Sequence, residues 1–104
     1  MKLLEKEFDF NFEEAENIEK IAELDKKYQE KIEKTDNLIE KCKIYKQFFD
    51  ELIGEGTSEK LFGVKNNLFE IMDVYQELVE EAERIVEKVN ERATKMKQKY
   101  ERYK

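Results

Sequence analysis

The sequence predicts an all-α protein: a helical hairpin or small bundle of long amphipathic helices, joined by a Gly-rich turn and a short helix, with an extended N-terminal arm. Apolar residues recur at steps of three, four and seven along most of the 104 residues, the period of a helix buried on one face. With three Gly and no Pro, the chain lacks the many tight turns of a β-sandwich or barrel. Charged residues make up 44%, which suits amphipathic helices in one domain better than a thick α/β core.

Residues 1–12 are expected to form the extended, Phe-rich arm. Phe8, Phe10 and Phe12 alternate with polar residues, as in a strand that carries three rings on one face. A single short strand is not stable alone. The arm therefore either packs across the protein's own helices or adds to the open sheet edge of a partner, and the sequence leaves both open.

Residues 13–53 are expected to be helical. Asp25 and Lys46 interrupt an otherwise apolar stripe. Asn37, followed three residues later by Glu40, has the spacing of a capping box that starts a new helix. Either one long bent helix or two helices broken near residue 36 satisfies the pattern. The stripe consists of Ile18, Ile21, Tyr28, Ile32, Ile39, Cys42, Phe49 and Ile53.

Residues 54–66 are predicted to form a turn and a short helix. Gly54 is placed to end the preceding helix in the left-handed conformation. Thr57 or Ser58 then caps a short helix that runs to Phe62, and a glycine closes it. The residues expected to set the geometry of this turn are Gly54, Gly56 and Gly63.

Residues 67–104 are predicted to form one long helix, with Asn66 or Asn67 as its cap. A third apolar row widens its buried stripe as far as Ile85, and beyond it the same row becomes Arg92 and Lys99. The first half thus suits burial in a core, and the second half suits a narrow coiled-coil seam or solvent. Because two helices bury only one stripe each, a third element must cover the rest: the Phe arm, the folded-back first helix or another protomer. On this ground we expect a homo-oligomer. The two main rows are Leu68, Tyr75, Ala82, Val89, Met96 and Tyr103, and Met72, Val79, Val86, Ala93 and Tyr100.

The charge and the residue types argue against an enzyme. The net charge is -6, but residues 92–104 hold six basic residues and one acid, so this segment carries +5 and the rest -11. An acidic body repels phosphate, so nucleic acid is not an expected partner. The cationic end either reflects the helix dipole, which favours cations at a helix C-terminus, or contacts phosphate or an acidic partner, and the sequence leaves both open. The chain has no His, the usual general base and commonest metal ligand. We therefore expect no catalytic, cofactor-binding or metal residues.

Apolar stretches of two or three residues are too short for a membrane span or a signal peptide. The only cysteine, Cys42, lies at a core-facing position, where it acts as a small hydrophobe. A lone thiol fits a reducing compartment. These features predict a cytoplasmic protein with no contact to a membrane.

The segment from Phe48 to Leu68, FFDELIGEGTSEKLFGVKNNL, resembles a signature of small tail-region proteins of tailed bacteriophages and prophages, the tail assembly chaperone-like family. The shared features are a helix that ends in an FFD-type cluster, a GEGT turn, a short KLFG helix and a long acidic amphipathic helix. The opening residues MKLLEKEFDFNF and the following AENIE are similar to the same group. The resemblance covers about half of the chain.

This resemblance implies a non-enzymatic protein that binds tape-measure or tail-tube subunits, or both, during tail morphogenesis, in the cytoplasm of an infected or lysogenic bacterium. Two other functions remain open. A phage-encoded acidic inhibitor of a host defence or nucleic-acid enzyme would use the face from Glu70 to Glu83, which holds six acids and no base. A structural oligomerisation module would use only the heptad rows. The candidate partner-binding residues are Phe8, Phe10, Phe12, Phe48, Phe49, Leu61 and Phe62.

Overall fold

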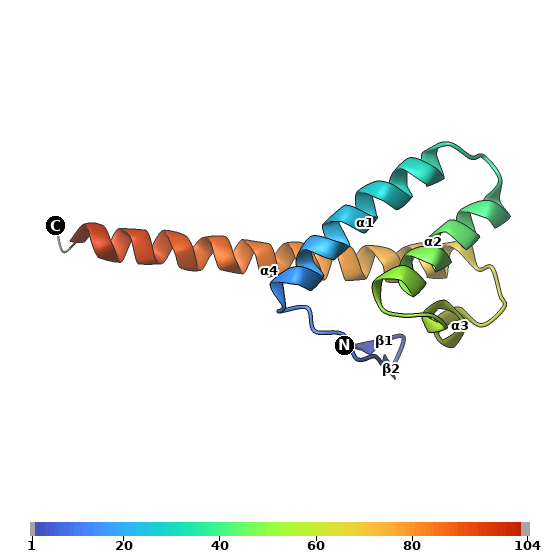
Figure 1. The fold of residues 1–104 in the computed structure, drawn as a ribbon, viewed down its shortest axis with the longest axis horizontal. Coiled ribbons are helices and arrows are strands. Elements are labelled where there is room, and N and C mark those ends of the chain that lie inside the picture. Colours follow the sequence, from blue (N-terminus) through green and yellow to red (C-terminus); the bar gives the residue numbers. More distant parts are fainter. Residues whose placement is uncertain (1, 103–104) are drawn as a thin grey trace.

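The computed structural model describes residues 2–102, with the side chains of residues 3–99 and 101. The fold is all-α, as predicted, apart from two strands of two residues each (Figure 1). The last heptad position, Tyr103, lies outside the described residues. The elements in chain order are β1 (Lys2–Leu3), β2 (Lys6–Glu7), α1 (Ala15–Glu33), α2 (Leu38–Leu52), α3 (Thr57–Phe62) and α4 (Leu68–Arg102).

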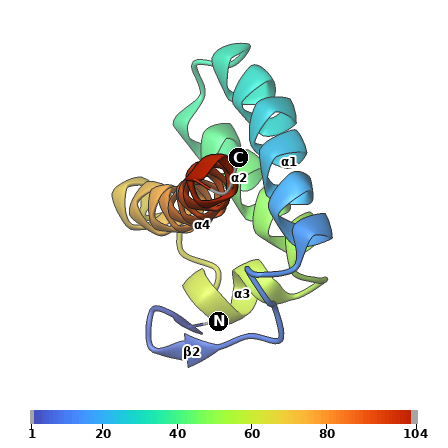
Figure 2. The same cartoon turned by 90° about the vertical axis from the view of Figure 1, so that its left-hand side faces the viewer.

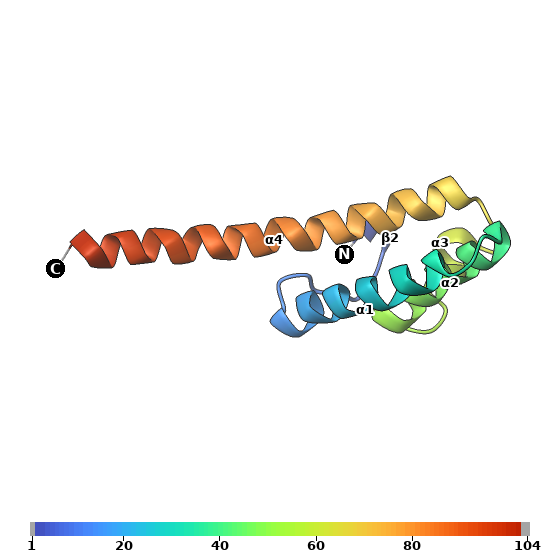
Figure 3. The same cartoon turned by 90° about the horizontal axis from the view of Figure 1, so that it is seen from above.

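The helices form a body around the first half of α4, and the second half of α4 projects from it (Figures 1 and 3). α1 and α2 make a hairpin that packs against α4, and α3 packs against α2. Seen along α4, α1 and α2 lie to one side and α3 lies below them with the strands (Figure 2). The molecule measures 60 × 30 × 20 Å. A 35-residue helix is about 53 Å long, so α4 sets the long dimension.

The core is an aromatic cluster that joins all four helices. Phe48 and Phe49 of α2 are 0% exposed. The Phe48 ring lies 4.5 Å from the ring of Tyr75 in α4 and 6.0 Å from that of Tyr28 in α1, centroid to centroid. Phe49 lies 5.6 Å from Phe62 of α3. These edge-to-face contacts are worth about 0.5–1.5 kcal/mol each beyond the area that they bury.

The two polar positions in the apolar stripe both have partners in the fold. The Tyr75 hydroxyl donates a hydrogen bond to the Asp25 carboxylate, which links α4 to α1. Lys46 Nζ donates to the Lys65 carbonyl oxygen at 2.8 Å and to Asn66 Oδ1 at 3.0 Å. Asp25 and Lys46 thus satisfy buried or loop polar groups, which would otherwise weaken the packing.

The break near residue 36 separates two helices, which decides between the two predicted arrangements. The Glu40 N–H donates to Asn37 Oδ1 at 3.0 Å, so Asn37 caps α2 as its spacing indicated. Asn67 is the equivalent acceptor at the start of α4, where it accepts from the Glu70 N–H at 3.3 Å. Ile39, which we expected in the buried stripe, is exposed. The neighbouring helices cover α2 only from Cys42 onward.

The start of α3 differs from its prediction. The helix begins at Thr57, and the N-cap is Gly56 in the left-handed region, with φ of 88°. A capping carboxylate comes instead from α2: Asp50 accepts from the Ser58 N–H at 2.8 Å and from the Ser58 hydroxyl at 3.0 Å. The prediction of a cap at Thr57 or Ser58 was wrong because Asp50, eight residues before Ser58, accepts the hydrogen bond from the free Ser58 N–H at the start of the helix.

We expect Asp50→Ala to lower the free energy of unfolding by about 1–3 kcal/mol, because the buried Ser58 N–H and hydroxyl would lose their acceptor. Urea unfolding followed by circular dichroism measures this change. Asp50→Asn, which keeps one acceptor oxygen, should cost less, and Glu55→Ala at an exposed turn position should be neutral. Equal stability of Asp50→Ala and the wild type would contradict this role.

The arm is not an extended strand. β1 and β2 form a hairpin whose turn residues, Leu4 and Glu5, have positive φ, as in the turns that favour two-residue hairpins. Residues 8–12 form no strand, and the Phe10 N–H donates to the Phe8 carbonyl oxygen at 2.9 Å. The strand prediction for Phe8–Phe12 was wrong. The three rings pack against the protein's own core, and this burial holds the segment in place without a pairing strand.

Candidate partner-binding surface

The second half of α4 carries apolar side chains that nothing in the body covers. From Val86 onward, no described side chain of this helix is buried and almost all are exposed. Val89 is 59% exposed and Met96 is 72% exposed. Both belong to the heptad rows, which continue without a break from buried positions such as Ala82. We call Val86, Val89, Ala93 and Met96 the open seam.

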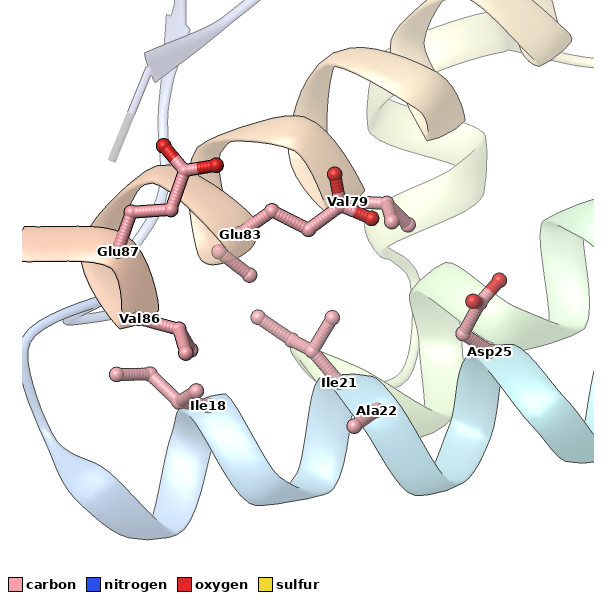
Figure 4. Close-up of a pocket in the computed structure, with 9 residues that line it drawn as sticks. Ile18, Ile21, Ala22, Asp25, Val79, Glu83, Val86 and Glu87 are labelled. Atoms are coloured by element: carbon pink, nitrogen blue, oxygen red, sulfur yellow. The ribbon is translucent and has the colours of Figure 1, made fainter. Parts of the chain in front are cut away.

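An apolar groove between α1 and α4 leads directly into the open seam. It encloses about 370 Å³. In Figure 4, Ile18 of α1 and Val86 of α4 point toward one another across it. Glu83 and Glu87 line its α4 side. An apolar floor with an acidic edge suits a helix whose apolar stripe is flanked by Lys or Arg. This α1/α4 groove is lined by Ile18, Ile21, Ala22, Asp25, Val79, Ala82, Glu83, Val86 and Glu87.

A second, larger groove of about 850 Å³ runs between the arm and α4. Phe10 and Phe12 line it from the arm, and Ile85 and Val89 line it from α4. The two rings contact each other edge to face, with centroids 5.3 Å apart. Of the predicted partner-binding residues, these two therefore border a surface groove while resting on the protein's own core. We call this the arm groove.

Four of the other predicted residues lie inside the body. Phe48, Phe49, Leu61 and Phe62 are all core residues. They were named as candidates within the segment that resembles phage tail-region proteins, but the helices turn those side chains inward. Phe48 and Phe49 have no exposed surface, and Leu61 and Phe62 are only 4% and 7% exposed, so the prediction for these four is corrected to a packing role.

Phe8 and the glycines have local roles. Lys60 Nζ lies 4.6 Å from the centroid of the partly buried Phe8 ring, and it donates to the Glu7 carbonyl oxygen at 3.0 Å. This pair fastens the arm to α3. The glycines lie at positive φ with nothing within 4 Å of an added Cβ. Their role is therefore the backbone conformation of the turn rather than close approach to a neighbour.

Charge is unevenly distributed along α4. The acids between Glu70 and Glu83 are all at or near the surface, and Glu81 pairs with Arg84 at 2.9 Å. Toward the end of the helix the exposed charges are mostly Lys95, Lys97 and Lys99. Within residues 2–102, no group of three or more His, Cys, Asp or Glu side chains could hold a metal ion. No helix in that range is long and apolar enough to cross a membrane.

Buried tyrosines tie α1 to its neighbours. Tyr28 donates to Glu51 of α2, and Lys27 Nζ lies 3.1 Å from Glu51 Oε1. Burial, with the Glu51 hydrogen bond and charge, raises the pKa of Tyr28 to about 12. Burial and the hydrogen bond to Asp25 likewise raise the pKa of Tyr75. The Tyr28 and Lys27 hydrogen bonds lower the pKa of Glu51.

We expect stability to fall at alkaline pH. Because the folded pKa of Tyr28 lies above its ordinary value of 10.0, its contribution is complete below pH 10 and is lost as the pH rises toward about 12. Tyr75 acts in the same direction. Each group can lower the free energy of unfolding by about 1.4 kcal/mol per pH unit in this window. Urea unfolding at pH 9, 10 and 11 measures how steeply the free energy of unfolding falls with pH. This slope should be shallower for the Tyr28→Phe variant than for the wild type. An identical slope in both proteins would contradict the assignment.

Sequence reasoning found the open seam but missed the groove beside it. The heptad rows already named Val79, Ala82 and Val86. The contribution of Ile18 and Ala22 depends on how α1 lies against α4, which no local pattern specifies. The polar break at Asp25 was the one signal of a cross-helix contact, and it marks the far end of the same groove.

A family model described as a family of unknown function (DUF6673) matches residues 4–104. No curated protein and no solved structure matches the chain.

Proposed function

The chain belongs to the DUF6673 family, whose function is unknown, and we propose that it is a non-enzymatic, tail assembly chaperone-like protein. In this role it holds an amphipathic helical segment of a phage tape-measure protein while the tail is built. The tail-tube subunit is the second partner in this proposal. The resemblance of residues 48–68 to small phage tail-region proteins supports the biological setting. The open seam supports the mode of binding.

The single observation that carries the proposal is the open seam at the end of the α1/α4 groove. Val86 belongs to both, so a partner helix in the groove would continue along Val89 and Met96. Full burial of a side chain of this size contributes about 1.5–3 kcal/mol. Three or four such contacts suffice for binding that is tight enough to act during assembly and weak enough to be reversed afterwards.

The acidic edge of the groove indicates what kind of helix fits. Asp25, Glu83 and Glu87 line it, so a partner with Lys or Arg beside its apolar stripe is attracted and an acidic helix is repelled. This selectivity depends on ionic strength because the edge is exposed to solvent. The arm groove, with Phe10 and Phe12, is the proposed contact for the tail-tube subunit.

Co-expression with the tape-measure and tail-tube proteins of the same phage or prophage tests this function. We expect a defined complex with at least one of them after affinity purification and size-exclusion chromatography with light scattering. Absence from the finished particle separates a chaperone from a permanent structural module. If the protein binds neither tail protein, the proposed function is wrong.

The acidic face from Glu70 to Glu83 supports a second candidate, an inhibitor that binds the phosphate-binding surface of a nucleic-acid enzyme. The acids on this face are at or near the surface, and Arg84 is the first base to follow them. Binding to such an enzyme that is present at about 50 mM salt and lost at about 500 mM, roughly a tenfold increase in ionic strength, would favour this candidate.

A further inference from the structure

We propose that the free protein closes its open seam with a second copy of itself, as an antiparallel dimer through the second half of α4. The occupant is a second copy because the charges beside the seam match those of the same helix when it runs in the opposite direction. The dimer itself does not depend on the tail-assembly function.

The apolar pattern of α4 is that of a two-stranded coiled coil. Up to Ile85, three apolar rows face the body; beyond it only two rows remain, spaced alternately by three and four residues. A seam of two rows, flanked by charged residues, is the pattern that pairs with one other helix in a coiled coil. Since Val89 and Met96 are mostly exposed, the chain leaves this seam without a partner in the described structure.

The charges beside the seam disfavour a parallel dimer. In the heptad abcdefg, Val86 and Ala93 occupy a, and Val89 and Met96 occupy d. Arg92 and Lys99 then occupy g, and Glu83 and Lys97 occupy e. In a parallel pair, each g residue faces the e residue five positions further along on the other helix. Arg92 would then face the partner's Lys97 twice in each dimer. The parallel arrangement would also bring the two cationic helix ends together.

An antiparallel dimer turns the same charges to advantage. In an antiparallel pair, the e residues of the two helices face each other. Glu83 therefore faces the partner's Lys97, and Lys97 faces the partner's Glu83. This places the two-fold axis near Asn90. Met96 then packs against the partner's Val86, and Val89 against the partner's Ala93. The cationic end of each helix lies over the acidic middle of the other.

One contact in this register is unfavourable. Arg92 faces its own copy across the two-fold axis. Both guanidinium groups are exposed, so solvent and salt screen the repulsion. Two matched pairs outweigh this single contact, whereas the parallel alternative offers like-charged contacts alone.

The dimer also gives the surface a regulatory property, and this step rests on the proposed function. The helix that closes the seam occupies Val86, Val89 and Met96, the same residues as the proposed tape-measure helix. A partner must therefore displace the second copy. The free protein would keep the open seam covered until a better helix is present.

Charge exchange tests the pairing on the protein alone, by sedimentation equilibrium at low salt. Glu83→Lys and Lys97→Glu should each weaken dimerisation about tenfold, because each turns both ion pairs into like-charged contacts. The double variant Glu83→Lys/Lys97→Glu should restore the wild-type affinity. A wild-type protein that stays monomeric up to about 100 μM would overturn the proposal, because this concentration is roughly ten times the dissociation constant of a typical weak dimer. So would a double variant as weak as the singles.

Spin labels measure the direction of the helices. In a Cys42→Ser background, which removes the native thiol, labels at Arg92→Cys and Lys99→Cys occupy equivalent flank positions one heptad apart. In the antiparallel dimer the two Arg92 labels lie opposite each other. The two Lys99 labels are offset by 14 residues, or about 21 Å along the axis. A clearly longer Lys99 distance supports the proposal, and equal distances at both positions overturn it. Neither measurement involves a tail protein, so the dimer can fail without the proposed function failing.

Discussion

Replacing Phe48 by Ala is expected to lower the free energy of unfolding by about 3–5 kcal/mol, a large share of the roughly 5–15 kcal/mol that stabilises a typical domain. The side chain has no exposed surface and contacts aromatic rings from α1, α2 and α4. The truncation leaves a cavity where these three helices meet. Urea unfolding followed by circular dichroism measures the loss.

Phe69→Ala is the matched control, because it removes the same atoms from a ring that is mostly exposed at the start of α4. It should change stability by less than about 0.5 kcal/mol. A loss below about 1 kcal/mol for Phe48→Ala would contradict the corrected, interior role of this residue. It would also reopen its prediction as a partner-binding side chain.

The double substitution Val89→Glu/Met96→Glu is expected to abolish partner binding while leaving the body folded. Both side chains lie on the open seam, beyond the part of α4 that packs against α1 and α2. A buried carboxylate opposite an apolar stripe costs about 2 kcal/mol or more at each site, so affinity should fall by at least about 100-fold. Pull-down and calorimetry with the proposed tape-measure partner measure this loss, and urea unfolding should be unchanged.

Thr94→Glu/Gln98→Glu is the control for this change. It adds the same two negative charges to the same exposed stretch of α4, on the face away from the seam. Binding should fall only slightly. If both double variants bind equally poorly, net charge rather than the seam governs the interaction, and if both bind as the wild type does, the seam is not the contact surface.

The helices were predictable because each follows from local chemistry. The 3.6-residue period reports burial on one face, and the caps at Asn37 and Asn67 fix where two of the helices start. The replacement of the third apolar row by Arg92 and Lys99 also predicted where α4 leaves the core. These signals lie within a few residues of the structure that they specify.

The arm and the turn cluster were not predictable in the same way. Alternation over Phe8–Phe12 is compatible with a strand, but the rings gain more by packing on helices that are distant in sequence. Likewise, the crowding of Phe48, Phe49 and Phe62 near the turn fits either a sticky surface or a core. Only the direction in which α2 and α3 fold onto α4 separates those two possibilities, and that direction depends on non-local contacts.

Amide hydrogen exchange over residues 86–102 tests most directly whether the second half of α4 is the binding surface. The comparison is between the protein alone, diluted to the monomer, and its purified complex with the tape-measure protein. We expect exchange in this segment to slow at least about tenfold in the complex, because a projecting helix frays and a packed helix does not. The amides of α2 serve as the internal reference and should be unchanged. A stable complex in which residues 86–102 exchange as fast as in the free monomer would contradict the central claim.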